Sequence, residues 1–230
     1  MKRILLIGDS IRKGYDRYVK ESFESKANVY FPEDNCRFAQ YVLRNFHSWC
    51  EDTGEKDFDL IHWNAGAWDT LRIYEDECLT PIDVYVNFLE RIQARIEKLY
   101  PNAISIFATT TPVIESGYIA DFEMRYNSDI ERYNLAATNA LSKRGVIIND
   151  LYSLLKNVPD SYHSDQTHFY TAAATELIGG RVNEVICSAL GIDNDALTVP
   201  DSSKFAIVTL KNDSEMYIKN GNKYEKIIGI

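Results

Sequence analysis

The stretch "LLIGDSIRKGY", residues 5–15, determines how the rest of the chain is interpreted. A short apolar run leads directly into Gly8, Asp9 and Ser10, and a possible helix follows them. An apolar run of this length before turn residues is typical of a buried strand. A serine at this junction can cap the helix, or its hydroxyl can point into a crevice and act as a nucleophile. The stretch therefore predicts a strand–turn–helix unit and leaves both roles open for Ser10.

Short apolar runs of the same kind alternate with longer segments of helical period. Their continuous hydrophobicity is typical of a parallel sheet that is covered on both faces. The predicted strands are 4–7, 28–31, 60–63, 104–108 and 146–148, and the predicted helices are 36–51, 82–99, 121–143 and 170–190, the last ending at Gly191. This alternation predicts an α/β fold, a three-layer α/β/α sandwich with a five-stranded parallel sheet.

The last forty residues do not follow this alternation. They contain Asn-Asp-Ser and Asn-Gly-Asn turn signals between β-prone runs, which predict a small hairpin or meander over about residues 204–229. We therefore expect a main domain over residues 1–192 and a C-terminal β extension over residues 193–230. The extension is expected to cover a sheet edge or to form a homodimer contact, and a contact with substrate is the less favoured alternative.

Composition excludes several classes of partner. The 230 residues are 45% hydrophobic, enough for one sizeable core, and 25 Lys and Arg against 34 Asp and Glu give a formal net charge of −9. This charge argues against nucleic acid as a partner. No apolar stretch approaches the roughly 18 residues of a membrane span, and the apolar run before Gly8 is too short for a signal peptide. We expect a cytoplasmic protein without a membrane partner.

Four cysteines are widely spaced along the chain and form no Cys-x-x-Cys pair, so the spacing indicates neither a zinc site nor a redox motif. They are expected to be reduced thiols, mostly in the core. The four are Cys36, Cys50, Cys78 and Cys187.

A second candidate segment is "HSDQTHFY", residues 163–170, which directly precedes the last predicted helix. In open α/β sheets, ligands bind at the carboxyl ends of the strands, and loops at that end carry the chemistry. Asp165 and His168 are three residues apart, so the carboxylate can accept from one imidazole nitrogen while the other acts as a base toward a hydroxyl. His163, Asp165 and His168 as metal ligands are the less favoured alternative, because nothing else completes a first shell.

The third candidate segment is "LIHWNAGAWDT", residues 60–70. The Asn64 amide and the Gly66 backbone N–H come directly after a buried strand and can donate hydrogen bonds to an oxyanion. Alternatively, Asn64 and Gly66 only build the turn, and Asp69 caps the segment that follows.

Together, these three segments resemble the SGNH hydrolases, also called the GDSL esterase family, over most of residues 1–190. The resemblance implies the flavodoxin-like SGNH hydrolase fold. It also implies that Ser10 is the nucleophile, that His168 is the general base and that Asp165 orients His168. No metal and no organic cofactor are needed for this chemistry. A Gly-x-Ser-x-Gly nucleophile elbow occurs nowhere in the chain, which disfavours the ordinary α/β-hydrolase arrangement.

The resemblance also implies an oxyanion hole, and here the chain departs from the family pattern. The family uses the N–H of the serine, an N–H of a second block and an Asn side chain of a third. The second block is "PEDNCRF", residues 32–38, where Cys36 stands in place of the expected glycine. In the third block Trp68 stands in place of the expected Asn, so Asn64 is the nearest substitute and Gly66 a further donor.

Two asparagines, Asn127 and Asn134, resemble positions of the family's penultimate helix, with expected structural roles.

The expected activity is that of a serine esterase that hydrolyses a small acyl ester, above all an acetyl ester on a carbohydrate, through an acyl-enzyme. Trp68, Tyr15 and Tyr74 lie beside the expected crevice, where aromatic faces suit a sugar ring. A thioesterase or lysophospholipase is the nearest enzymatic alternative. A non-catalytic carbohydrate-binding or scaffold protein is a different alternative, which Trp68 motivates. A nucleotide-binding protein is disfavoured because no Gly-x-Gly-x-x-Gly follows a strand.

Overall fold

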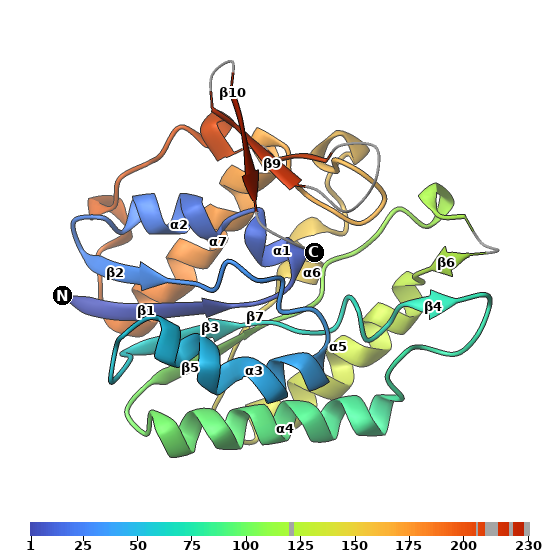
Figure 1. Ribbon diagram of the computed structural model, residues 1–230, viewed down its shortest axis with the longest axis horizontal. Helices are drawn as coiled ribbons and strands as arrows, with labels where there is room; N and C mark the ends of the chain where they lie inside the picture. The colour runs from blue at the N-terminus through green and yellow to red at the C-terminus, as the bar shows by residue number, and fades with distance from the viewer. Residues whose placement is uncertain (120–121, 206, 210–215, 221–222, 228–230) are drawn as a thin grey trace.

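The fold is built on a central sheet of five parallel strands (Figure 1). The structure is a computed structural model, and it describes residues 1–119, 122–205, 207–209, 216–220 and 223–227. The strand order is β2-β1-β3-β5-β7, and every pairing is parallel. The strands are β1 Lys2–Ile7, β2 Ala27–Tyr30, β3 Leu60–Trp63, β5 Ile104–Ala108 and β7 Ile147–Asn149. The fold class predicted from the sequence is confirmed, and each strand lies within two residues of its predicted position.

Both faces of the sheet are buried, which explains the continuous hydrophobicity of its strands. Leu5 and Ile7 face one side of the sheet and Ile4 and Leu6 face the other, and all four side chains are fully buried. Successive residues of a strand point to opposite faces, so a strand that is covered on both sides is mostly apolar. The buried polar exceptions include His62 in β3 and Ser105 in β5.

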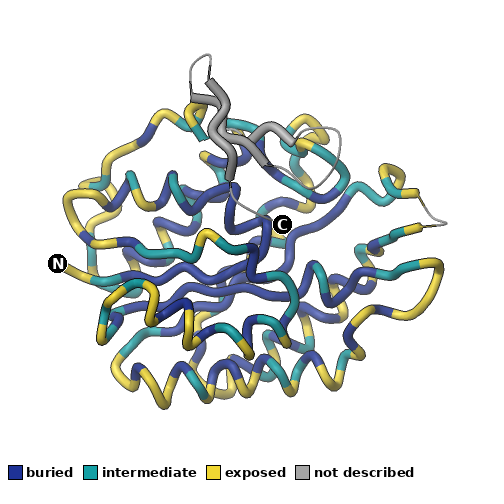
Figure 2. Tube along the Cα trace, viewed as in Figure 1, coloured by how far each residue is buried: buried dark blue, intermediate teal, exposed yellow. Residues whose placement is uncertain are grey.

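Two groups of helices cover the sheet (Figures 1 and 2). On one face the core cluster includes residues of α3 Ala39–Asp52, α4 Ile82–Leu99 and α5 Asn127–Ser142. On the other face it includes residues of α1 Ser10–Lys13, α2 Asp16–Ser22, α6 Leu151–Leu155 and α7 Ala172–Leu190. As predicted, α7 ends at Gly191, which adopts a left-handed conformation with φ of 67°.

Three helices begin later than predicted: α7 by about two residues, α3 by about three, and α5 by the most. Helix α5 begins at Asn127, whereas the helical period predicted a start near residue 121. The two residues of β6, Glu123–Met124, instead pair antiparallel with β4, Arg72–Ile73, and form a two-stranded ribbon. Local periodicity does not report a pairing partner fifty residues away, so this part of the prediction was wrong.

The C-terminal segment contains three antiparallel strands in the order β10-β9-β8, which is a meander as predicted. They are β8 Ile207–Thr209, β9 Met216–Asn220 and β10 Lys223–Ile227. Residues 204–205 of the predicted meander belong instead to a 3-10 helix, and its remaining residues lie outside the described ones. The described residues also include four 3-10 helices: Glu115–Gly117, Asp160–Tyr162, Asn194–Ala196 and Ser202–Phe205. The division into domains at residue 192 stays a prediction.

All four cysteines are free and buried, as expected. Burial raises the pKa of the Cys36 thiol to about 12, so this thiol is not a nucleophile near neutral pH. Within the described part of the chain, none of the helices combines the length and the apolar composition needed to cross a bilayer.

Candidate active site

Ser10, His168 and Asp165 lie in one hydrogen-bonded row at the carboxyl end of the sheet. Ser10 directly follows the turn after β1, and the other two come from the loop that precedes α7. The distance from His168 Nε2 to Ser10 Oγ is 2.8 Å, and that from His168 Nδ1 to Asp165 Oδ2 is also 2.8 Å. The structure thus brings Ser10 next to two residues that lie more than 150 positions later in the sequence. A hydroxyl that faces an imidazole oriented by a carboxylate is an arrangement suited to nucleophilic attack.

Asp165 is held as an anion by its hydrogen bonds. Burial alone raises the pKa of this carboxyl group, but the hydrogen bond from the His168 ring, the charge of that ring and two backbone N–H groups outweigh it and hold the pKa at about 2. The two N–H donors are those of Thr167, at 2.7 Å, and His168, at 2.8 Å. The carboxylate therefore stays ionised at every pH at which neutral His168 acts as a base, and it fixes the ring by accepting at Nδ1.

The residue that caps helix α1 is Asp9, and Ser10 is the first residue of that helix. The Asp9 carboxylate accepts from the N–H of Ile11 at 3.0 Å. The capping role that the sequence left open for Ser10 is thus filled by its neighbour. The N–H of Ser10 has no hydrogen-bond partner in the described structure, as is usual for the first turn of a helix. This N–H is free to donate to an oxyanion.

A residue that the sequence analysis missed is Tyr170, two positions after His168. Its ring stacks on the His168 imidazole, with centroids 4.6 Å apart and an angle of 17° between the planes. Its hydroxyl donates to the carbonyl of Ser10 at 2.8 Å, and only 1% of the side chain is exposed. Tyr170 thus contacts both the expected base and the backbone of the expected nucleophile, and it fixes their relative position. The only sequence signal was an aromatic residue directly beside the histidine motif.

The predicted role of the Cys36 backbone was wrong. The loop after β2 folds back onto the turn after β1, and the N–H of Cys36 donates to the Gly8 carbonyl at 3.2 Å. An N–H that already has this partner is not available to an oxyanion. The residue with a positive φ in this loop is Arg37, at 50°, so Cys36 itself carries no backbone strain.

Asn64 is buried next to Gly8 and acts on the Asp9 carboxyl group. Burial raises the pKa of the Asp9 carboxyl group, and a hydrogen bond from the Asn64 amide acts in the opposite direction. A Cβ atom on Gly8 would lie 1.9 Å from Asn64 Oδ1, so only glycine leaves room for the Asn64 side chain at this turn. Asn64 Oδ1 has no hydrogen-bond partner within the described residues, and the expected role of the amide as an oxyanion donor stays a prediction.

Gly66 is confined by its backbone and by its neighbours. Its φ is 149°, and a Cβ atom there would lie 2.1 Å from Thr110 Oγ1. Thr110 cannot easily yield, because Asn134 binds both its N–H and its carbonyl, each at 2.9 Å. Asn127 binds the N–H and the carbonyl of Val113 in the same way, at 3.0 and 2.9 Å. Both asparagines thus have contacts of the structural kind that was expected. The N–H of Gly66 has no partner among the described residues.

We expect Gly66→Ala to lower the free energy of unfolding by about 1 to 3 kcal/mol, because the new methyl group overlaps Thr110 Oγ1 and the backbone conformation disfavours a side chain. Gly180→Ala is the matched control, since no atom lies within 4 Å of a Cβ at this position of α7. The control should gain about 0.5 to 1 kcal/mol from the higher helix propensity of alanine. Urea denaturation of both variants measures the effect, and an unchanged midpoint for Gly66→Ala would contradict the tight contact.

The three aromatic residues that were expected to contact substrate lie in different environments. Tyr15 is 1% exposed and packs edge-on against His62 in the core, so this expectation was wrong for Tyr15. Its position on the first turn after Ser10 placed it near the crevice in sequence, but the ring faces the sheet. Trp68 is half-buried, and Tyr74 is 71% exposed and contacts Phe122 of the ribbon, with centroids 5.8 Å apart.

Two further interpretations are revised by their contacts. Asp69 does not cap the segment that follows it, because its carboxylate accepts from the N–H of Ala39, the first residue of α3, at 3.1 Å. Burial raises the pKa of Asp69 to about 7. His163, the third member of the alternative metal set, packs against Phe169 with ring centroids 3.9 Å apart, whereas His168 is engaged by Ser10 and Asp165.

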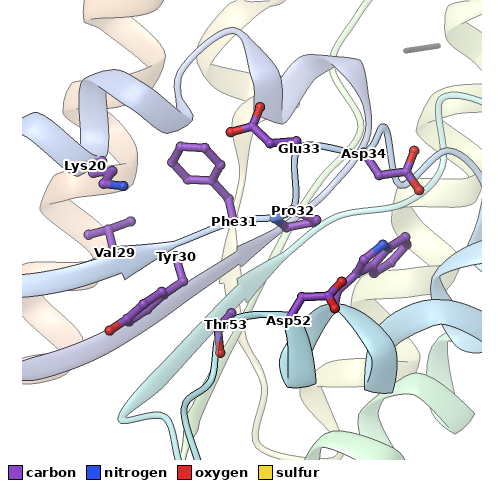
Figure 3. Close-up of a pocket in the computed structure, with 10 residues that line it drawn as sticks. Lys20, Val29, Tyr30, Phe31, Pro32, Glu33, Asp34, Asp52 and Thr53 are labelled. Carbon is purple, nitrogen blue, oxygen red and sulfur yellow. The ribbon is translucent and has the colours of Figure 1, made fainter. Parts of the chain in front are cut away.

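A cavity of about 550 Å³ lies beside the edge strand β2 and contains none of the three residues of the row (Figure 3). Its wall includes Tyr30, Phe31 and Trp49, and Glu33 and Asp34 stand at the start of the loop that leads to Cys36. The cavity is therefore separate from the hydroxyl of Ser10.

Solved structures similar to this chain are acyl hydrolases by their descriptions. A lipase/acylhydrolase from Enterococcus faecalis is 18% identical with a TM-score of 0.62, over 87% of this chain and 99% of that protein. A GDSL-like lipase from Bacteroides thetaiotaomicron is 14% identical with a TM-score of 0.63, over 82% and 89%. A catalytic mutant of an acetylxylan esterase from Geobacillus stearothermophilus is 11% identical with a TM-score of 0.57, over 84% and 95%.

No protein-family model and no curated protein sequence matches the chain. At these identities, the structural likeness speaks for the fold. The parallel sheet, the serine after its first strand and the histidine loop before its last helix agree with that likeness. This chain has the SGNH hydrolase fold, the fold of the GDSL-like lipases and acylhydrolases.

Proposed function

We propose that this protein is a serine esterase of the SGNH hydrolase family that cleaves small acyl esters, above all acetyl esters of carbohydrates. The observation that carries the proposal is the 2.8 Å contact between Ser10 Oγ and His168 Nε2, with Asp165 on the opposite nitrogen of the ring. This geometry matches the roles of nucleophile, general base and orienting carboxylate.

The reaction follows from these positions. Ser10 Oγ attacks the ester carbonyl carbon while its proton moves to His168 Nε2, and the carbonyl oxygen becomes an oxyanion. The C–O bond to the alcohol then breaks, and His168 returns the proton to the leaving oxygen. Water, deprotonated by His168, attacks the acyl-serine and releases the acid and the Ser10 hydroxyl. We assign the oxyanion contacts to the N–H groups of Ser10 and Gly66, which have no partner in the described structure.

The substrate assignment rests on the surroundings of the row. Acetylxylan esterases are among the solved structures with this fold, and their substrate carries acetyl groups on a sugar. Trp68 and Tyr74 supply aromatic surface on the segments that follow β3. A second candidate is the hydrolysis of longer acyl chains, as in a lysophospholipase. It is supported by exposed apolar side chains on and beside the ribbon: Ile119 and Tyr74, each 71% exposed, and Phe122, 50% exposed.

The test is a panel of acetylated xylan, 4-nitrophenyl octanoate, palmitoyl lysophosphatidylcholine and an acetyl thioester, combined with fluorophosphonate labelling at neutral pH. We expect acetate release from acetylated xylan to have the highest kcat/KM and the label to reside on Ser10. A preference for the octanoate or the lysophospholipid would support the second candidate. No adduct on Ser10 and no turnover of any substrate would identify a non-catalytic protein with this fold.

A further inference from the structure

Arg125 is a buried cation without an anionic partner. Its side chain follows strand β6 and is 7% exposed. Its Nε donates to the Ala67 carbonyl at 2.6 Å, and its Nη1 donates to the Tyr118 hydroxyl at 3.3 Å. Both acceptors are neutral. Within the described ranges, no carboxylate forms an ion pair with this guanidinium.

Both of its partners belong to the edge of the candidate active site. Ala67 follows Gly66 in the turn after β3. The Tyr118 hydroxyl lies 2.6 Å from Thr167 Oγ1, in the loop that carries Asp165 and His168. Arg125 therefore connects the turn after β3 to the loop of the expected base. Its charge also acts on Asp9, the residue before Ser10: burial raises the pKa of that carboxyl group, and the Arg125 charge opposes the effect.

Arg12, another buried arginine near the site, has the anionic partner that Arg125 lacks. Arg12 is 1% exposed, and its Nη1 is paired with the Asp16 carboxylate. A buried charge is costly unless it is paired, because the desolvation penalty is not returned by neutral partners. The guanidinium also lies over the Tyr118 ring, 5.9 Å from its centroid. Nη2 of Arg125 has no hydrogen-bond or ion-pair partner among the described residues and is not among the atoms sealed from solvent. This nitrogen therefore keeps some contact with solvent and is available to a group that arrives from there.

We propose that Arg125 binds a carboxylate of the substrate, so that the enzyme prefers esters that carry a negative charge beside the scissile bond. This inference rests on the proposed esterase function. The carboxylate lies either on the alcohol, as in an acetylated acidic sugar, or on the acyl group, as in a half ester of a dicarboxylic acid. A guanidinium binds either group through charge-assisted hydrogen bonds.

The test compares two pairs of esters, each an anionic carboxylate and its neutral methyl ester. The first pair is 4-acetoxybenzoate and its methyl ester, which places the charge on the alcohol. The second pair is mono-4-nitrophenyl glutarate and 4-nitrophenyl methyl glutarate, which places it on the acyl group. The readout is the ratio of kcat/KM for the anionic ester to that for the neutral ester. Comparing this ratio between variants cancels the intrinsic reactivity of each ester.

We expect Arg125→Gln to lower this ratio about 10- to 100-fold for one pair, because a charge-assisted hydrogen bond is lost. The pair that responds identifies the side of the ester that carries the charge. Arg125→Lys, which keeps the charge, should retain part of the preference. The control Arg181→Gln removes a surface arginine of α7 that pairs with Glu184 and should leave the ratio unchanged.

Other outcomes separate the proposal from its basis. If Arg125→Gln slows both members of each pair equally, Arg125 only braces Ala67 and Tyr118, and the proposal is overturned while the esterase function stands. If no ester is hydrolysed at all, the proposed esterase function fails. Whether Arg125 binds a carboxylate is then tested by ligand binding alone. In that case glutarate or benzoate should raise the Tm of the wild-type protein and not that of Arg125→Gln. The absence of a shift in the wild type would overturn the subsite as well.

Discussion

Ser10→Ala is expected to lower kcat for 4-nitrophenyl acetate by about 10⁴- to 10⁶-fold, as for the loss of the nucleophile of a serine hydrolase. The physical reason is that the acyl-enzyme path is lost, because no other described hydroxyl is hydrogen-bonded to His168 Nε2. Water held by the same site then reacts directly, and only the oxyanion contacts and substrate binding still help. Steady-state release of 4-nitrophenolate measures the loss of kcat. Active-site titration measures any contaminating wild-type enzyme that could account for residual activity.

The control for this variant is Ser202→Ala, which removes a surface hydroxyl that donates to Glu176 at 3.2 Å. It should keep wild-type kcat and wild-type labelling by a fluorophosphonate. Ser10→Ala should keep the wild-type circular dichroism spectrum, because the substitution removes a single hydroxyl group and leaves the backbone of α1 unchanged. Retention of more than about a tenth of wild-type kcat in Ser10→Ala would be incompatible with a covalent mechanism at this residue.

Local patterns predicted the elements that depend on local physics. The five strands were found because both faces of the sheet are buried, so that each strand is a continuous apolar run bounded by turn residues. The end of α7 was found because Gly191 adopts the left-handed conformation that glycine accepts most readily. Asp165 and His168 were found because three residues of loop are enough to bring a carboxylate to its imidazole.

Features that depend on distant partners were not predictable in this way. The N–H of Cys36 meets the Gly8 carbonyl only because two loops from neighbouring strands fold together. The ring of Tyr15 turns toward His62, and nothing in the motif around Ser10 reports that direction. The same holds for Tyr170 and Arg125, whose partners Ser10 and Ala67 are 160 and 58 residues away in the chain.

The contacts around Ser10 show why long-range packing that the sequence did not predict matters for function. Its hydroxyl faces His168, its carbonyl accepts from Tyr170, and its neighbour Asp9 caps the helix that orients it. The Tyr170 ring also stacks on His168, so one side chain controls both members of the nucleophile–base pair. Positioning of this kind is needed because a misplacement of about 1 Å can cost a reaction two orders of magnitude. A motif names the reacting groups, and the packing around them supplies their alignment.

His168→Ala should lower kcat by about as much as Ser10→Ala, because a hydroxyl without a base stays protonated and is a weak nucleophile. The double variant Ser10→Ala/His168→Ala should then be no slower than either single variant, since the two residues act as one unit. His47→Ala is the matched control: this histidine of α3 is exposed and lies 3.4 Å from Glu51, far along the chain from the row. Steady-state kinetics of the four proteins on 4-nitrophenyl acetate decide the matter. Additive losses in the double variant would show that Ser10 and His168 contribute independently, and the 2.8 Å contact between them would then have no part in proton transfer.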